Sequence, residues 1–329
     1  MNSTTPNDRI QRAASASDSH PICPVCGGKT KFFYRLKRHS CKAWRCRGCG
    51  FVWIDPPLRG ADEEYIDHYE QPDYVACIQA GDNTKHKEHL ANIDRAIDLA
   101  TAPNQRVLEI GSSYGYMLEL LAARGFAVEG IELLQAGVAS SRARGLTVHR
   151  VPLERFTASA PYGIIISTHV VEHLRDIRAY FQKTSEMLSP GGLNILLTPN
   201  ADATLFYLLR QFWAGATPDE HNLFLGFRTA RSLAAQYGFE VIALKTTGRY
   251  WSTARGILAE IYHMRKKQTV RPEASGADAP HMPTHRRPGR RDAIFKLIAQ
   301  VESPFLTLLH KGLARVGKSD ELLLVLRKK

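Results

Sequence analysis

The fold is decided by the stretch Val107-Leu108-Glu109-Ile110-Gly111-Ser112-Ser113-Tyr114-Gly115-Tyr116-Met117-Leu118-Glu119-Leu120-Leu121. It begins with residues suited to a buried strand, turns at two glycines, and continues as an apolar, helix-forming run that stops at Gly125. A strand, a glycine turn and a helix N-terminus together form the cradle that binds nucleotide-like ligands. We therefore expect a cofactor site here, where Gly111 lets the backbone turn sharply and Gly115 lets it approach the ligand.

The next predicted strand, Ala127 to Ile131, ends at Glu132, which lies 21 positions after Gly111. An acid at about this distance is placed to accept hydrogen bonds from ribose hydroxyls. The spacing is not the dinucleotide fingerprint, because Ser113 stands where that motif has its second glycine. The plain alternative is the strand–turn–helix of some other α/β protein.

Glu109, Gly111 and Gly115 resemble the first motif of the class I S-adenosylmethionine-dependent methyltransferases, acid-x-Gly-x-Gly-x-Gly, with Ser113 replacing one glycine. The resemblance implies an α/β fold with a Rossmann-like, seven-stranded, mostly parallel sheet and helices on both faces. Apolar runs place its strands at 107–110, 127–131, 146–149, 162–167, 193–197, 239–244 and 321–327, with a turn at 189–192. It also implies S-adenosylmethionine as cofactor, bound by Glu109, Gly111, Ser113, Gly115, Glu132, Leu133, Leu153 and Ser167.

Candidate catalytic residues follow the fourth strand, in Thr168-His169-Val170-Val171-Glu172-His173-Leu174. In an open parallel sheet the ligand crevice lies outside the carboxyl ends of the strands. The segment resembles the Glu-His-Leu motif of small-molecule methyltransferases, including the quinone-biosynthesis O-methyltransferases, with His169 where that group often has an acid. We expect His173 or His169 to act as general base, because imidazole titrates near working pH.

Two other roles remain open for these histidines. His169, Glu172 and His173 could instead hold a divalent metal ion that activates a substrate hydroxyl. His221 precedes an aromatic run, as in the same methyltransferase group, and we expect it near the substrate face. Its alternative is a helix-entry histidine that bonds to the backbone.

Two Cys-x-x-Cys pairs, separated by nineteen residues, precede the predicted core: Cys23 with Cys26, and Cys46 with Cys49. Four thiolates at this spacing form a closed, tetrahedral, structural zinc site. We therefore expect a zinc-ribbon module over residues 20–60. Disulfides are the alternative, and a cytoplasmic location argues against them.

The charge of +12 is unevenly distributed along the 329 residues. Residues 20–60 carry +8, residues 61–244 carry −7 and residues 245–329 carry +11. We expect a disordered tail (1–19), the ribbon, a methyltransferase core (61–244), a basic amphipathic insert (245–320) and a last core strand (321–329). The insert is expected to hold helices at 254–265 and 293–313 around a flexible linker at 268–289. A basic amphipathic insert suits a membrane surface or a lipid-linked substrate. The alternative is that its helices merely cover the sheet or a partner subunit.

Two features that are missing after the fourth strand argue against some classes of methyl acceptor. There is no Asn/Asp-Pro-Pro-Tyr motif and no cysteine, which argues against methylation of exocyclic base amines and of cytosine C5. The zinc-ribbon arrangement at Cys23, Cys26, Cys46 and Cys49 also resembles bacterial methyltransferases associated with polysaccharide or glycolipid modification. We expect methyl transfer, at oxygen, to a small-molecule, saccharide or lipid-linked acceptor.

Two alternatives to this function are kept. The first is an RNA methyltransferase whose basic ends grip phosphates, which we rank lower. The second is a non-catalytic cofactor-binding protein. The N-terminus lacks the apolar core of a signal peptide and no run of eighteen apolar residues occurs, so we expect a cytoplasmic protein with peripheral contact at the inner membrane surface.

Overall fold

The computed structural model describes residues 20–36, 40–58, 84–98, 104–217, 220–247 and 308–329. The predicted tail at 1–19, the predicted helix at 254–265 and the predicted linker at 268–289 lie outside the described residues. Of the predicted helix at 293–313 only the end is described, and residues 308–315 are helical. Within the described part of the chain, no helix is long and apolar enough to cross a membrane.

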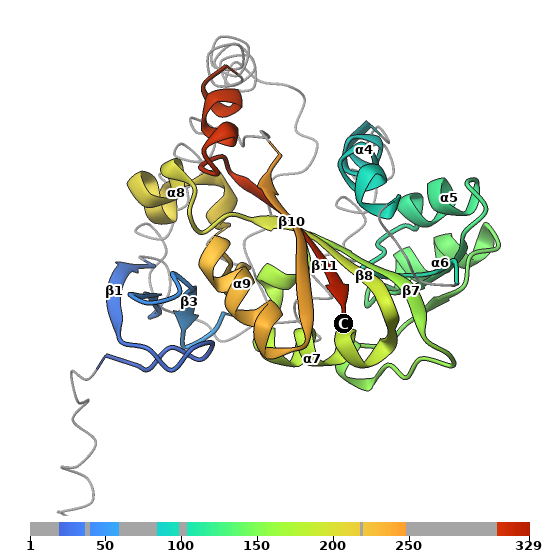
Figure 1. Cartoon of the computed structure of the whole chain (residues 1–329), viewed down its shortest axis with the longest axis horizontal. Coiled ribbons are helices and arrows are strands. Elements are labelled where there is room, and N and C mark those ends of the chain that lie inside the picture. Colours follow the sequence, from blue (N-terminus) through green and yellow to red (C-terminus); the bar gives the residue numbers. More distant parts are fainter. Residues whose placement is uncertain (1–19, 37–39, 59–83, 99–103, 218–219, 248–307) are drawn as a thin grey trace, which may run out of the picture.

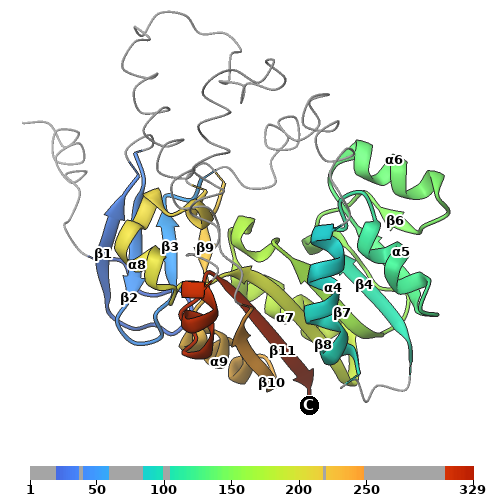
Figure 2. The same ribbon diagram turned by 90° about the horizontal axis from the view of Figure 1, so that it is seen from above.

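The centre of the molecule is a seven-stranded sheet in the order β10-β11-β8-β7-β4-β5-β6 (Figures 1 and 2). Strands β4 to β8 run parallel to one another, and β11 runs antiparallel to both of its neighbours, β8 and β10. The predicted Rossmann-like fold is therefore confirmed. The strands are β4 (Arg106–Ile110), β5 (Ala127–Ile131), β6 (Val148–His149), β7 (Tyr162–Thr168), β8 (Leu188–Pro199), β10 (Phe239–Thr246) and β11 (Glu321–Lys328).

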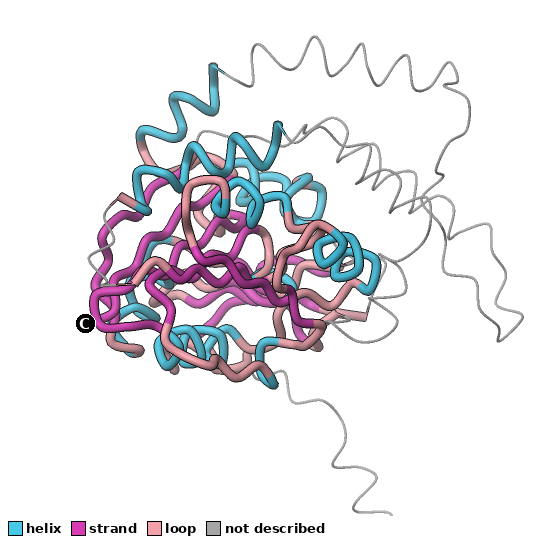
Figure 3. Tube along the Cα trace, turned by 90° about the vertical axis from the view of Figure 1, so that its right-hand side faces the viewer, coloured by secondary structure: helices cyan, strands magenta, loops and turns pink. Residues whose placement is uncertain are grey.

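Helices cover both faces of this sheet (Figure 3). Because side chains alternate along a strand, Val107 of β4 packs with α4 and α5, whereas Leu108 and Ile110 pack with α7 and α9. The helices are α4 (Thr84–Ile97), α5 (Tyr116–Ala122), α6 (Gln135–Ala143), α7 (Ile177–Met187), α8 (Thr204–Leu209) and α9 (Phe227–Gln236). Single 3₁₀ turns are η1 (Leu153–Arg155), η2 (Val171–His173), η3 (Arg210–Phe212) and η4 (Ala214–Ala216).

Two local predictions about the sheet were wrong. The turn expected at 189–192 lies inside β8, because Leu188 already pairs with Tyr162 of β7 and pairing resumes at Leu193 with Ile164. The four intervening residues bulge out of the ladder instead of ending it. The third strand is shorter than expected, because only Val148 and His149 pair with β5.

The cysteine module forms a second sheet in the order β1-β2-β3-β9, seen side by side in Figure 2. Its strands are β1 (Thr30–Arg35), β2 (Lys42–Cys46), β3 (Val52–Asp55) and β9 (Leu223–Phe224). The fourth strand comes from the methyltransferase core, since Phe224 pairs with Val52 and Leu223 with Trp53. The sequence did not predict this strand, because two residues carry no periodic signal.

Polar contacts also fix the cysteine module to the core. Arg45 of β2 forms an ion pair with Asp202, with 2.9 Å between Nη2 and Oδ1. The Thr229 hydroxyl of α9 donates a hydrogen bond to the Cys49 carbonyl at 3.0 Å. The module therefore packs directly against α9 and against the segment that follows β8.

Candidate active site

The turn between β4 and α5 has the backbone conformation of a ligand cradle. Gly111 and Gly115 have φ of 74° and 73°, in the left-handed region that favours glycine. A Cβ on Gly111 would lie 2.5 Å from Val170 Cγ2, and one on Gly115 would lie 2.6 Å from Ser141 Oγ. Both positions therefore need glycine for space as well as for backbone conformation.

Two acids flank the cradle, as predicted. The carboxylate of Glu132 accepts hydrogen bonds from three backbone N–H groups, those of Ser113 at 2.5 Å, Leu133 at 2.6 Å and Leu134 at 2.9 Å. A carboxylate has about four acceptor positions, so one remains for a ribose hydroxyl. Burial raises the pKa of Glu132 against the opposing effect of these hydrogen bonds.

Glu109 is the buried acid of the cradle. Among the described residues its Oε2 atom has no hydrogen-bond partner. Burial, and then the charge of Glu132, raises the pKa of Glu109 well above its usual range. A buried carboxyl oxygen without a partner calls for a donor, and the ammonium group of S-adenosylmethionine is such a donor. The cradle therefore fits this cofactor.

Of the remaining predicted cofactor residues, two lie beside the cradle and two are buried elsewhere in the core. Ser113, with φ of 48°, and Leu133 reach Glu132 through their backbones. Leu153 is buried in η1. The Ser167 hydroxyl lies 2.7 Å from the Tyr180 hydroxyl in the core. Its hydroxyl is thus used within the core, and the cofactor contact of Ser167 stays a prediction.

His169 follows β7 but does not resemble a general base. Its Nδ1 lies 3.2 Å from Glu172 Oε1 and its Nε2 lies 2.9 Å from Glu321 Oε1. Burial lowers the pKa of His169, but the hydrogen bonds and charges of the two carboxylates outweigh it and raise the pKa to about 9. An imidazole held between two carboxylates cannot readily accept a proton near neutral pH, so the structure gives no support to the predicted catalytic role of His169.

Glu172 is buried in η2, among the histidines at the carboxyl edge of the sheet where the crevice is expected. Its second oxygen accepts a hydrogen bond from the Thr198 hydroxyl at 3.0 Å. Although burial raises its pKa, the hydrogen bond and charge of His169, with smaller effects of His221 and His173, lower it to about 2. Glu172 is therefore an ionised, internally bound carboxylate that can orient its neighbours.

His173 and His221 pack directly against each other. Their rings meet edge to face, with centroids 4.7 Å apart. His221 is buried, its Nδ1 donates to the Gly215 carbonyl at 3.0 Å, and burial, then the charge of His173, lowers its pKa to about 3. His221 thus bonds to the backbone, as its alternative expected, and it also packs against His173. Its position near the substrate face stays a prediction.

The metal set that the sequence suggested is not the one that the structure brings together. Within the described part of the chain, Glu172 groups with His173 and His221, whereas His169 groups with His89 and Glu321. In each group the candidate ligand atoms lie within 4.8 Å of one another. His169, Glu172 and His173 therefore do not share one metal position.

Sequence reasoning missed Asn222, which joins the crevice to the cysteine module. Its N–H donates to the Glu172 carbonyl at 2.7 Å and its Nδ2 to the His173 carbonyl at 3.3 Å. Its Oδ1 accepts from the Leu58 N–H at 2.6 Å, and its carbonyl accepts from the Ile54 N–H at 2.9 Å. A lone asparagine before a two-residue strand gives no sequence signal for this role.

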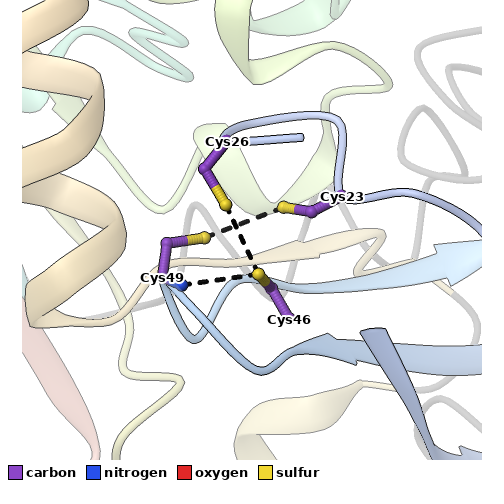
Figure 4. Close-up of side chains that lie close together, drawn as sticks. All are labelled: Cys23, Cys26, Cys46 and Cys49. Carbon is purple, nitrogen blue, oxygen red and sulfur yellow. Dashed lines mark hydrogen bonds between the residues drawn. The ribbon is translucent and has the colours of Figure 1, made fainter. Parts of the chain in front are cut away.

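The four cysteines of the module converge, and their sulfurs point toward one another (Figure 4). Cys23 and Cys49 sulfurs are 3.7 Å apart, and Cys26 and Cys46 sulfurs are 3.4 Å apart. Sulfurs around a tetrahedral zinc ion, with Zn–S of about 2.3 Å, lie about 3.8 Å apart. The cluster is therefore compatible with a bound zinc ion.

The strand order, the glycine cradle and its distal acid define a class I S-adenosylmethionine-dependent methyltransferase fold. Residues 83–244 match the family model described as "Methyltransferase domain". This segment is therefore a class I methyltransferase domain, and it contains the cradle and the three histidines of the predicted site.

Curated relatives are similar to about a third of the chain. A ubiquinone biosynthesis O-methyltransferase of Paramagnetospirillum magneticum is 33% identical over 108 residues, covering 31% of this chain and 43% of that protein. The enzyme of the same name from Bradyrhizobium diazoefficiens is 27% identical over 141 residues, covering 36% and 56%. The chain thus spans about half the length of these relatives.

Among solved structures, the cyclopropane synthase MmaA2 of Mycobacterium tuberculosis aligns with a TM-score of 0.47 and 17% identity, covering 81% of this chain and 94% of that one. A sarcosine dimethylglycine methyltransferase from Galdieria sulphuraria, described as putative in its title, aligns with a TM-score of 0.45 and 14% identity, covering 75% and 86%.

Proposed function

We propose that the protein transfers the methyl group of S-adenosylmethionine to an oxygen of a small-molecule, saccharide or lipid-linked acceptor. The observation that carries this proposal is the glycine cradle, where the unpartnered carboxyl oxygen of Glu109 and the backbone-bound carboxylate of Glu132 lie beside one loop. The histidine crevice follows the neighbouring strand β7 at the same carboxyl edge of the sheet.

In this proposal Glu109 and Glu132 hold the cofactor, which supplies an already activated methyl group. The protein then mainly positions the acceptor and removes its proton. His173 is the group that we assign as general base, because it lies at the crevice next to Glu172 and against His221. Of the other two histidines, His169 is bound between two carboxylates and His221 has a lowered pKa.

The acceptor class is supported by the relatives and by charge. The relatives named above are called ubiquinone biosynthesis O-methyltransferases, which favours methylation at oxygen of a small molecule. The basic terminal regions, +8 and +11, suit an anionic or lipid-linked acceptor, and peripheral membrane contact would bring the enzyme to such a lipid.

We also propose that the cysteine cluster binds one structural zinc ion. Burial raises the pKa of Cys46, and the hydrogen bond with Cys23, followed by burial, raises that of Cys49. Zinc must displace these protons, and its binding then stabilises a module with little core of its own. Purified protein should contain zinc that Cys46→Ser releases; a folded, metal-free module would contradict the proposal.

Enzymatic assay of purified protein tests the proposed function. Incubation with S-adenosylmethionine and separate pools of polyhydroxylated aromatics, saccharides, lipid extract and RNA should yield S-adenosylhomocysteine with one of the first three. His173→Ala should reduce turnover about a hundredfold or more, whereas His149→Ala, a partly exposed histidine paired with Glu129, should not.

The other outcomes discriminate between the alternatives. Product formation with RNA alone, with binding that weakens steeply as salt rises, would support the RNA methyltransferase instead. Cofactor binding without turnover on any pool would support the non-catalytic protein.

A further inference from the structure

Three side chains that are distant in sequence meet beside the crevice: His89 of α4, His169 after β7 and Glu321 at the start of β11. The distance to Glu321 Oε1 is 2.9 Å from His169 Nε2 and 3.7 Å from His89 Nε2. The two imidazole rings are tilted, with centroids 5.4 Å apart. His89 and Glu321 are buried, so the cluster is an internal feature of the molecule.

The backbone fixes two of these residues at the carboxyl edge of the sheet. Because β11 runs antiparallel to β8, its first residue, Glu321, pairs with Pro199 at the end of β8. His169 has a φ of 54°, and its N–H donates to the Leu197 carbonyl at 2.8 Å. The left-handed conformation is uncommon for a residue other than glycine, and such conformations concentrate at functional sites.

We propose that His89 Nε2, His169 Nε2 and Glu321 Oε1 bind a divalent transition-metal ion, at a site separate from the cysteine cluster. Two imidazoles and one carboxylate form a ligand set used for zinc and for iron(II). With metal–ligand distances of about 2.0–2.1 Å, tetrahedral ligand atoms lie about 3.3–3.4 Å apart. The observed separations from Glu321 Oε1, 2.9 Å and 3.7 Å, fall on either side of that value.

The outer contacts of the cluster are those of a metal site. A metal-bound histidine almost always donates its other ring N–H to a carboxylate, a carbonyl or water. His169 Nδ1 lies 3.2 Å from Glu172 Oε1, whose carboxylate is itself fixed by the Thr198 hydroxyl. The second oxygen of Glu321 accepts a hydrogen bond from the Thr247 hydroxyl at 2.6 Å, which fixes the orientation of the carboxylate.

The charge of the cluster also favours a divalent ion. The side chains of Glu172 and Glu321 are both fully shielded from solvent. A divalent ion bound by neutral imidazoles would offset both negative charges. Buried charges are retained where they are paired or coordinate a metal. The rival interpretation is a metal-free ion-pair network centred on protonated His169.

Metal analysis of the full-length protein, stripped and reloaded with zinc, distinguishes these interpretations. Wild-type protein should bind two zinc ions, of which Cys46→Ser loses the one at the cysteine cluster and His89→Ala loses the other. His149→Ala serves as the matched control and should retain all bound zinc. Zinc content that is unchanged by His89→Ala would overturn the proposal.

A second variant guards against misfolding of His89→Ala. Glu172→Gln leaves the three ligands in place and should weaken metal affinity 10–100-fold, the usual effect of removing such an orienting partner. Cobalt(II) bound to Cys46→Ser should show ligand-field bands without thiolate charge transfer. Unchanged affinity in Glu172→Gln, or no cobalt bands in Cys46→Ser, would show an ion-pair network instead. These readouts do not depend on methyl transfer, so they can fail separately from the proposed function.

Discussion

Asn222 offers a sharp test of how the crevice is held, because one side chain connects it to the cysteine module. Asn222→Ala removes the acceptor of the Leu58 N–H and the donor to the His173 carbonyl. A buried polar group left without a partner costs about 1–3 kcal/mol. The contact with His173 is long, at 3.3 Å, so we expect a total loss of about 2–4 kcal/mol in the free energy of unfolding.

Asn194→Ala is the matched control for this loss. Asn194 is also fully buried, and its side chain also makes two hydrogen bonds, with Thr184 and Tyr180. It lies between β8 and α7, within the core rather than at the crevice. Denaturant unfolding should therefore show similar destabilisation in the two variants.

Turnover separates the two variants. Asn222→Ala removes the side-chain bond to the His173 carbonyl and keeps the backbone bond to the Glu172 carbonyl. His173 is thereby loosened, and misplacement of a catalytic group by about 1 Å can cost about a hundredfold in rate. We expect a large fall in kcat for Asn222→Ala, measured below its unfolding transition, and near-normal kcat for Asn194→Ala. Equal turnover in the two variants would refute the positioning role of Asn222.

Two further predictions concern protons. Because burial and the charge of Glu132 raise the pKa of Glu109, binding of the cofactor's ammonium group should release a proton from Glu109. Calorimetry should therefore show a binding heat that depends on the buffer in wild type and does not in Glu109→Gln. A buffer-independent heat in wild type would contradict this prediction. Burial lowers the pKa of His221 to about 3, and an unfolded histidine titrates near 6.5, so the unfolded chain binds the extra proton and stability falls as pH drops from about 6.5 to 3. His221→Gln should reduce this slope by up to about 1.4 kcal/mol per pH unit in denaturant titrations, and an unchanged slope would show that His221 is not buried and neutral.

The sheet and the cofactor cradle could be predicted from sequence because their signals are local. Gly111, Gly115 and Glu132 belong to one strand–turn–helix–strand unit, in which apolar periodicity fixes the elements and glycine marks the turn. The last strand was also predictable, since residues 321–327 form a continuous apolar run bounded by charges.

The rest of the site depends on contacts between distant elements, which no local pattern encodes. His89 and Glu321 meet His169 only after α4 and β11 have packed on the sheet. The hydrogen bonds of His169 to Glu172 and Glu321 could not be foreseen, because Glu321 lies 152 residues further along the chain. Asn222 acts through backbone groups, which have no residue-specific signature.

Calorimetric titration with S-adenosylmethionine tests the central claim, that the turn between β4 and α5 binds this cofactor. Gly111→Ala and Gly125→Ala both place a side chain on a left-handed residue, with φ of 74° and 89°, at a similar cost of about 1–2 kcal/mol. Only the Cβ at position 111 meets a neighbour, Val170 at 2.5 Å, whereas the one at position 125 meets nothing within 4 Å. The account predicts that wild type and Gly125→Ala bind with equal affinity and that Gly111→Ala binds at least about tenfold more weakly, a loss of about 1.4 kcal/mol or more. Wild-type affinity in Gly111→Ala, or no binding to the wild-type protein, would contradict it.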